Sequence, residues 1–231
     1  MQDTEQVYSK VSTEILARYG KIYDWPLKAQ LMGMREMQVH YLMQAAEFLV
    51  KTVALPITPQ EYLIERNAKQ VTLLTQNRLF PECKILPGVE RLVTHLKQQG
   101  VPIAVCTSSH RKAYDLKTSK HTTFFSLFDA VICGDDPAGT TNNLVVNGKP
   151  APDIFIQGLA ALGFTDGFER VLVFEDAPAG VRAGLAAGMQ VVWIPDPNLH
   201  VDSAIGDQCA QILNSMEEFI PHEYGLSPYQ T

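Results

Sequence analysis

Apolar residues change their spacing near Leu86-Pro87-Gly88, and this change divides the chain into two regions. In the first region they recur at helical spacing, which predicts helices over about Thr4 to Tyr19 and Arg35 to Thr52. The sequence Thr58-Pro59-Gln60-Glu61 is typical of a further helix start, with proline in the first turn. No strand pattern appears before residue 100, so this region is predicted to be a small helical bundle.

In the second region, short apolar runs alternate with amphipathic stretches. The apolar runs predict strands at Val101–Cys106, Phe128–Cys133, Val171–Phe174 and Val191–Ile194. The amphipathic stretches predict helices at Val89–Gln99, Pro152–Leu162 and Ala179–Ala187. Such alternation favours an α/β fold with a parallel sheet covered by helices on both faces. Ligands of these sheets bind beyond the carboxyl ends of the strands, so the residues that come after each strand carry the candidate chemistry.

Composition narrows the possible classes of protein. With 46% hydrophobic and 19% charged residues, the chain can bury a core and is not expected to be disordered. The net charge of −6 offers no electrostatic footprint for nucleic acid or an anionic membrane, although a local pocket can still attract an anion. The four cysteines (Cys83, Cys106, Cys133 and Cys209) lack the spacing of a zinc site or a disulfide framework. No leader-like apolar stretch opens the sequence, so a cytoplasmic protein without membrane spans is expected.

Three polar clusters lie at the predicted strand ends or before a helix. Thr107-Ser108-Ser109 can offer hydroxyls and backbone N–H groups to a phosphate. Lys149 lies between proline-restricted turns and can neutralise a phosphoryl group. Glu175-Asp176 place two carboxylates side by side, and Mg²⁺ would offset their repulsion. Taken together, the clusters indicate a phosphate site that needs a divalent metal.

Each cluster also has a purely structural interpretation. The hydroxyl residues can be ordinary helix N-caps, and the lysine can be a solvated surface residue in a proline-rich turn. Asp176 can act as an N-cap favoured by the helix dipole. The functional interpretation therefore depends on the three clusters meeting at one sheet edge, and a nucleophile is still lacking.

The order of these motifs resembles that of the haloacid dehalogenase-like (HAD) hydrolases. Thr107, the segment GKPAPDIF around Lys149 and the segment VFEDAPAGVRAGLAAGM around Glu175-Asp176 are similar to the second, third and fourth motifs of that family. The segments LKTSKHTTFFSLFDAVICGDDP and EYGLSPY are most similar to the pseudouridine-5'-phosphatase branch, with glycerol-3-phosphatases and β-phosphoglucomutases as nearby relatives. The resemblance implies a Rossmann-like parallel-sheet core over residues 83–231 and an N-terminal all-helical cap over residues 1–82 that closes over substrate.

The resemblance also implies residue roles. Thr107 and Ser108 would bind the phosphoryl oxygens, and Lys149 would bridge the phosphate and the nucleophile. Asp176 and Glu175 would hold Mg²⁺. The turn Gly33-Met34-Arg35 matches the substrate-specificity loop, so Arg35 is a candidate substrate contact, with a solvated helix residue as an equal alternative. The implied partner is a small phosphorylated metabolite, bound by a monomer without nucleic acid or membrane.

One family motif has no counterpart in the sequence. Family members carry an apolar strand that ends in DxDG, whose first aspartate attacks phosphorus and whose second is the general acid and base. Here Asp3 matches the aspartate at the entry to the cap, and no DxD occurs elsewhere. Without that nucleophile, covalent catalysis is expected to be lost. The strand would also be missing from the sheet between the strands that end at Cys106 and Phe174. The unpaired edges are expected to cost about as much as the whole stability of a domain, so folding as well as catalysis is expected to suffer.

Three functional hypotheses are compatible with these residues. The first is a Mg²⁺-dependent phosphatase for a small sugar or nucleoside phosphate, inactive as given because the nucleophile is absent. The second is a shortened, non-catalytic relative that binds a phosphorylated ligand or a partner. The third is a phosphoryl mutase similar to β-phosphoglucomutase, which product analysis would separate from a hydrolase.

Overall fold

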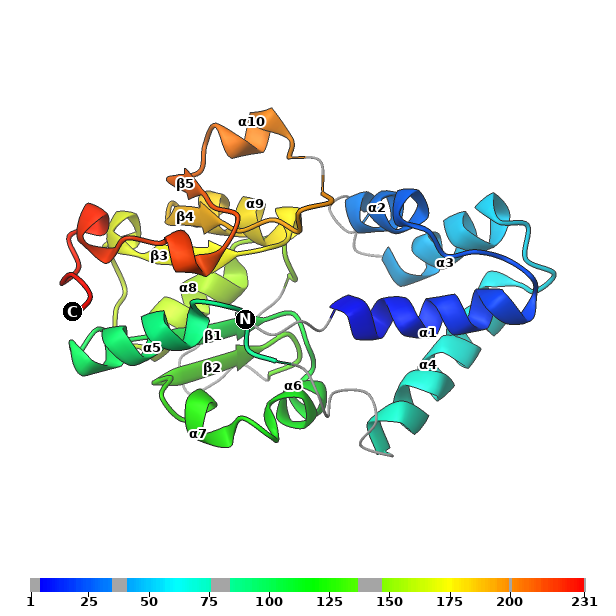
Figure 1. The fold of residues 1–231 in the computed structure, drawn as a ribbon, viewed down its shortest axis with the longest axis horizontal. Helices are drawn as coiled ribbons and strands as arrows, with labels where there is room; N and C mark the ends of the chain where they lie inside the picture. Colours follow the sequence, from blue (N-terminus) through cyan, green and yellow to red (C-terminus); the bar gives the residue numbers. More distant parts are fainter. Residues whose placement is uncertain (1–4, 35–40, 76–83, 137–146, 200, 231) are drawn as a thin grey trace. The chain divides into compact units, whose positions relative to one another are not determined.

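The structure is a computed structural model that describes residues 5–34, 41–75, 84–136, 147–199 and 201–230. The chain divides into two compact units, Gln2–Lys84 and Ile85–Thr231 (Figure 1). The first unit is helical within the described residues, and the second combines strands with helices. The predicted fold class, a parallel-sheet core with an N-terminal helical cap, is confirmed.

Helices α1 to α4 form the helical unit. They span Glu5–Arg18, Trp25–Met34, Tyr41–Thr52 and Pro59–Thr75. Helix α4 begins with the capping pattern read in the sequence, because Glu61 accepts from the Thr58 backbone N–H at 2.7 Å and its own N–H donates to the Thr58 hydroxyl at 3.2 Å. The core of this unit contains Val11, Ile15, Leu16, Leu27, Leu31, Ala45, Ala46, Leu49, Leu55 and Tyr62. Its apolar faces at helical spacing agree with the pattern in the sequence.

Within the described residues, five short parallel strands build the α/β unit. They are β1 (Ala104–Thr107), β2 (Ala130–Cys133), β3 (Leu172–Glu175), β4 (Gln190–Trp193) and β5 (Gln211–Ile212). Strand β1 pairs with β2, and β4 pairs with both β3 and β5, always in parallel. The result is one sheet of two strands and one of three. In the described part of the chain no ladder joins β1 to β3, which is where the sequence predicted a break.

Helices cover both faces of these strands (Figure 1). They are α5 (Val89–Gln98), α6 (Arg111–Thr118), α7 (Thr122–Phe125), α8 (Asp153–Ala161), α9 (Pro178–Ala186) and α10 (Ser203–Gly206). The described part of this unit also contains three 3₁₀ helices, η1 (Phe168–Arg170), η2 (Met216–Glu218) and η3 (Pro221–Tyr224).

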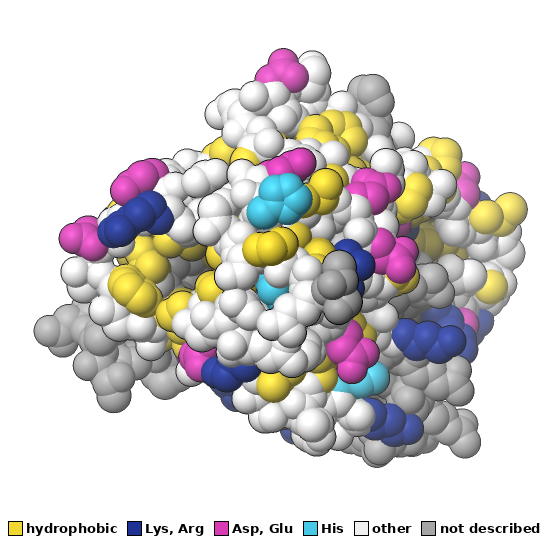
Figure 2. Space-filling view, turned by 60° about the vertical axis from the view of Figure 1, so that its left-hand side comes forward, with side chains coloured by type: hydrophobic (Ala, Val, Ile, Leu, Met, Phe, Trp, Pro, Cys, Tyr) yellow, Lys and Arg dark blue, Asp and Glu magenta, His cyan; other side chains and the backbone are white. Residues whose placement is uncertain are grey.

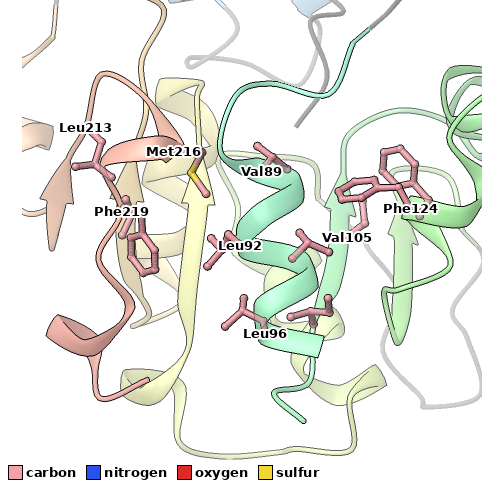
Figure 3. Close-up of a cluster of buried hydrophobic side chains, with 12 residues drawn as sticks. Val89, Leu92, Leu96, Val105, Phe124, Leu213, Met216 and Phe219 are labelled. Atoms are coloured by element: carbon pink, nitrogen blue, oxygen red, sulfur yellow. The ribbon is translucent and has the colours of Figure 1, made fainter. Parts of the chain in front are cut away.

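The alternation of side chains along the strands assigns each face its own core. Val192 packs in a cluster with α5 and the segment around Met216 and Phe219, whereas its neighbours Val191 and Trp193 pack in a second cluster with α8 and α9. Figure 3 shows Val89, Leu92 and Leu96 of α5 projecting into the first cluster. Both clusters are almost fully buried, so the strands are held by helices on both faces.

Two predicted strands begin later than the apolar pattern suggested. The predicted strands Val101–Cys106 and Phe128–Cys133 are in fact Ala104–Thr107 and Ala130–Cys133. Pro102 has no N–H to donate to a ladder. Ile103 and Asp129 bond to each other instead, since the Asp129 N–H donates to the Ile103 carbonyl at 2.8 Å and the Ile103 N–H donates to Asp129 Oδ2 at 3.0 Å. The remaining predicted strands and helices of the unit shift by only one residue at their ends.

Figure 2 shows acidic, basic and hydrophobic side chains scattered among one another over one face of the described residues. This agrees with the net charge of −6 and with a surface that carries no broad basic patch on that face. Over the described ranges, none of the helices is both long enough and apolar enough to cross a membrane.

Candidate phosphate site at the carboxyl ends of the strands

Lys149 forms the centre of the candidate site. Its ammonium donates to the carbonyl of Cys106 in β1 at 3.0 Å and is paired with the carboxylate of Glu175 in β3. The two side chains are only 11% and 9% exposed. Since β1 and β3 are not joined by a ladder, the Lys149 side chain links the two sheets at their carboxyl ends. The predicted meeting of lysine and carboxylate at this edge is present in the structure.

Phe155 in the first turn of α8 supports the lysine from the other side. The Lys149 ammonium lies 4.7 Å from the centroid of the Phe155 ring, within reach of a cation–π interaction. Helix α8 itself can approach β1 because Gly158 has no side chain: a Cβ there would lie 2.5 Å from the sulfur of Cys106. Burial raises the pKa of the Cys106 thiol to about 12, so this cysteine is a packing residue rather than a nucleophile.

Glu175 is packed against the start of helix α9. A Cβ at Gly180 would overlap the Glu175 carboxyl group, so glycine at this position makes room for the carboxylate. Burial raises the pKa of Glu175 above its ordinary value; the Lys149 ammonium lowers it in part, and the negative charge of Asp176 raises it again. Glu175 is therefore a carboxylate that the fold buries at a cost and that its lysine partner keeps in place.

Asp176 differs from its neighbour because it is exposed. Its backbone carbonyl accepts from the indole N–H of the fully buried Trp193 at 3.0 Å, which fixes the main chain at this point. No hydrogen bond or ion pair within the described residues uses the Asp176 carboxylate. An anchored backbone with a solvent-facing carboxylate is suited to binding a cation or a ligand.

Thr107 and Ser108 form a tight turn at the end of β1. The Ser109 N–H donates to the Thr107 hydroxyl oxygen at 3.1 Å, and this leaves the hydroxyl proton of Thr107 for an anion. Ser108 is exposed, while Ser109 receives a hydrogen bond from the Lys117 ammonium at 2.9 Å. Thr107 directly follows Cys106, whose carbonyl binds Lys149, so the predicted hydroxyl and the predicted lysine meet at the same strand end.

The carboxylates at the site fit Mg²⁺ only as a small ligand set. Across the described ranges, no group of three or more His, Cys, Asp and Glu side chains gathers as a protein-only metal cage. Mg²⁺ commonly needs only one or two carboxylates, with water and substrate phosphate oxygens as its other ligands. The exposed Asp176 carboxylate fits that smaller set, whereas the Glu175 carboxylate is buried and paired with Lys149; both remain the predicted ligands. Arg35, the predicted substrate contact, lies outside the described residues.

Sequence reasoning missed a second pair of adjacent carboxylates at a strand end. Asp135 and Asp136 come after β2 as Glu175 and Asp176 come at the end of β3. In the structure both are engaged by Arg111, at the start of α6: the Arg111 N–H donates to Asp135 at 2.6 Å and its side chain pairs with Asp136. The pattern that marked residues 175 and 176, two adjacent carboxylates after an apolar strand, is also present at residues 135 and 136. Here, however, the carboxylates bind Arg111 instead of forming a candidate cation site.

Comparison with known proteins gives this site its context. A model of the haloacid dehalogenase-like hydrolase family matches residues 3–188. The chain belongs to this family. Both the predicted family and the predicted fold are thereby confirmed.

Two curated relatives are similar over nearly the whole chain. One is (DL)-glycerol-3-phosphatase 2 of Arabidopsis thaliana, 40% identical over 99% of this chain and 88% of that protein. Another is the "Probable pseudouridine-5'-phosphatase" of Drosophila melanogaster, 37% identical over 98% of this chain and 90% of that protein. A solved HAD-family hydrolase from Deinococcus radiodurans, with bound phosphate and sodium, has a TM-score of 0.69 over 96% of this chain and 91% of that one. At 22% identity, that likeness is one of fold.

Proposed function

We propose that this HAD chain provides the phosphate-binding and metal-binding part of a Mg²⁺-dependent phosphomonoester hydrolase. The observation that carries the proposal is the Lys149 ammonium, held between the Cys106 carbonyl and the Glu175 carboxylate next to Thr107. A fixed positive charge can neutralise the oxygens of a phosphoryl group, and the Thr107 hydroxyl, which accepts from the Ser109 N–H, still has its proton to donate to one of them. Because these groups are held before the ligand arrives, they need little rearrangement to bind it.

Each residue has a distinct role in this proposal. The Thr107 hydroxyl and the Ser108 backbone donate to phosphoryl oxygens, and Lys149 neutralises their charge. Glu175 orients the lysine through their ion pair. Asp176, with Glu175, would hold Mg²⁺, which supplies charge neutralisation at the phosphate when it is bound.

The proposed substrate is a small sugar phosphate or nucleoside phosphate. This rests on the names of the two relatives, one a glycerol-3-phosphatase and the other a pseudouridine-5'-phosphatase, at 40% and 37% identity. Because the two identities are nearly equal, they support the common class, a phosphomonoester of a small hydroxylated molecule. Arg35 stays a candidate substrate contact, with a solvated helix residue as the alternative.

For the 231-residue chain alone we propose binding without turnover. The family resemblance assigns phosphoryl attack to the aspartate of a DxDG motif, and these residues contain no DxD. Of the carboxylates at the site, Glu175 is committed to Lys149 and packed against Gly180. A lost nucleophile in other enzymes costs on the order of 10⁶-fold in turnover.

The test is calorimetric titration of the purified chain with inorganic phosphate, with and without Mg²⁺, alongside phosphate-release assays on glycerol 3-phosphate and pseudouridine 5'-phosphate. Lys149→Met should abolish phosphate binding, and Asp176→Asn should remove its Mg²⁺ dependence. Lys120→Met, at an exposed position, is the matched control and should bind like the unmodified chain. Equal phosphate affinity in Lys149→Met would refute the site, and rapid Mg²⁺-dependent turnover by the unmodified chain would refute the proposal of binding alone.

A further inference from the structure

The Arg111–Asp136 ion pair lies beside the proposed phosphate loop, and the proposed function gives it no role. Arg111 is the first residue of α6, and Asp136 lies in the loop after β2. Arg111 Nε donates to Asp136 Oδ1 at 3.0 Å, and Arg111 Nη2 is bonded to Asp136 Oδ2, so the guanidinium grips the carboxylate at two points. Their side chains are 39% and 19% exposed, which makes this pair more enclosed than an ordinary surface ion pair.

The pair also occupies the outer edge of β2. Val131 and Cys133 are two residues apart, so in a parallel strand their backbone groups point to the same edge. Arg111 Nη2 donates to the Val131 carbonyl at 2.9 Å, and the Cys133 N–H donates to Asp136 Oδ2 at 2.7 Å. The two side chains therefore satisfy backbone groups that a neighbouring strand would otherwise bind, and they hold Arg111 in register with β2.

A second set of contacts attaches the loop after β1 to the loop after β2. The Arg111 N–H donates to Asp135 Oδ1 at 2.6 Å, and the Gly134 N–H donates to the Ser109 carbonyl at 3.0 Å. The loops touch so closely that a Cβ at Gly134 would lie 2.7 Å from the Ser108 carbonyl oxygen. The loop after β2 therefore sets the backbone of residues 108–111.

We propose that Arg111, through Asp136, is a positioning residue for the phosphate-binding loop Thr107–Ser109. It does not touch the ligand in this proposal. It holds the turn in which the Ser109 N–H bonds the Thr107 hydroxyl, and so fixes the direction of that hydroxyl and of the Ser108 backbone. The inference rests on the proposed function, because it assigns the loop to phosphate.

The chain offers a matched control at the opposite end of the same two strands. Lys97 pairs with Asp129, and Asp129 Oδ2 accepts from the Ile103 N–H at 3.0 Å, which ties the amino end of β1 to that of β2. Lys97→Met thus breaks a more exposed ion pair that joins the same two strands, remote from the phosphate loop. It tests whether a loss of binding is only a loss of stability.

The experiment measures the affinity of the whole chain for inorganic phosphate in the presence of Mg²⁺, together with the urea midpoint, for Arg111→Met, Arg111→Lys, Asp136→Asn and Lys97→Met. Arg111→Met and Asp136→Asn should both weaken phosphate binding by about 10- to 100-fold, the effect of losing one hydrogen bond to a charged oxygen. Arg111→Lys, which keeps the charge but not the two-pronged grip, should fall between them and the unmodified chain. Lys97→Met should lower the urea midpoint and leave phosphate affinity within about twofold.

Arg111 and Asp136 carry opposite charges, so comparing Arg111→Met with Asp136→Asn distinguishes positioning of the loop from electrostatic attraction of phosphate. If Arg111 acted only through its charge, Asp136→Asn would strengthen phosphate binding, and that result would overturn the inference. Unchanged affinity in Arg111→Met, or an equal loss in Lys97→Met, would overturn it as well. Absence of phosphate binding by the unmodified chain would instead refute the proposed function, and this inference with it.

Discussion

Replacing Lys149 by methionine should cost far more stability when Glu175 is present than when it is not. With Lys149 gone, the Glu175 carboxylate is only 9% exposed and has lost its counter-charge. Removing one partner of a buried ion pair typically costs about 3–5 kcal/mol. In a Glu175→Gln background the same replacement removes an ammonium that has already lost its counter-charge, so its cost is at most that of the bond to the Cys106 carbonyl, about 1 kcal/mol. We therefore expect the two costs to differ by at least about 2 kcal/mol.

Urea unfolding followed by tryptophan fluorescence measures both costs. The chain has two tryptophans, so a Trp25→Phe background leaves the fully buried Trp193 as reporter of the α/β unit. With an m-value of about 1–3 kcal/mol/M, a cost of about 3 kcal/mol moves the midpoint by about 1–3 M. The exposed pair Lys97–Asp129, at 40% and 37% exposure, is the control and should show a coupling below about 1 kcal/mol. Equal costs of Lys149→Met in both backgrounds would refute the buried, coupled pair.

Three further outcomes are expected. Gly180→Ala should lower the free energy of unfolding by about 1–2 kcal/mol, because the new methyl group displaces the Glu175 carboxylate and outweighs the gain of alanine in a helix; unchanged urea midpoints would contradict this. Burial raises the pKa of Glu175 above its ordinary value of 4.5. Protonation of Glu175 therefore stabilises the folded state; this stabilisation is fully present below about pH 4.5 and is lost as the pH rises through the folded-state pKa. The stability of the unmodified chain relative to Glu175→Gln should therefore fall over that window in urea titrations, and a rise would refute the stated environment. Iodoacetamide at about pH 8 should leave Cys106 and Cys133 unmodified in peptide maps of the folded chain, since burial raises their pKa values to about 12 and about 11; rapid labelling of either would show that its thiol is accessible and ionised.

The sequence predicted the α/β unit well because its strands are short apolar runs with little ambiguity. The errors at Val101 and Phe128 arose because hydrophobicity does not record which backbone groups are free to join a ladder. At these positions Pro102 has no N–H to donate. The N–H and the carbonyl of Ile103 are both hydrogen-bonded to Asp129. Helix α2 (Trp25–Met34) was not predicted, since Pro26 and Gly33 disguise its helical pattern.

The candidate site was predictable as a set of residue types but not as a set of contacts. Sequence order placed Thr107 and Glu175 at strand ends and Lys149 just before a helix, and the structure brings all three to one edge of the sheets. That Glu175 faces Lys149 while Asp176 faces solvent depends on Gly180 and on the bond from Trp193 to the Asp176 carbonyl. Arg111 was not identified from the sequence, because the groups that it binds, the Val131 carbonyl and the Asp136 carboxylate, lie twenty or more positions away in the chain.

The separation of β1–β2 from β3–β4–β5 makes any ligand at this site a cross-link between two blocks of backbone. A phosphate ion held by Thr107 on one side and by Lys149 on the other would add a second polar link across the break, beside the contacts of Lys149 with Cys106 and Glu175. Bound phosphate would then stabilise the state in which the two blocks are held together, by RT ln(1 + [L]/Kd). Amide hydrogen exchange in β1 and in β3 should slow together as phosphate is added, although no backbone hydrogen bond passes between these strands within the described residues.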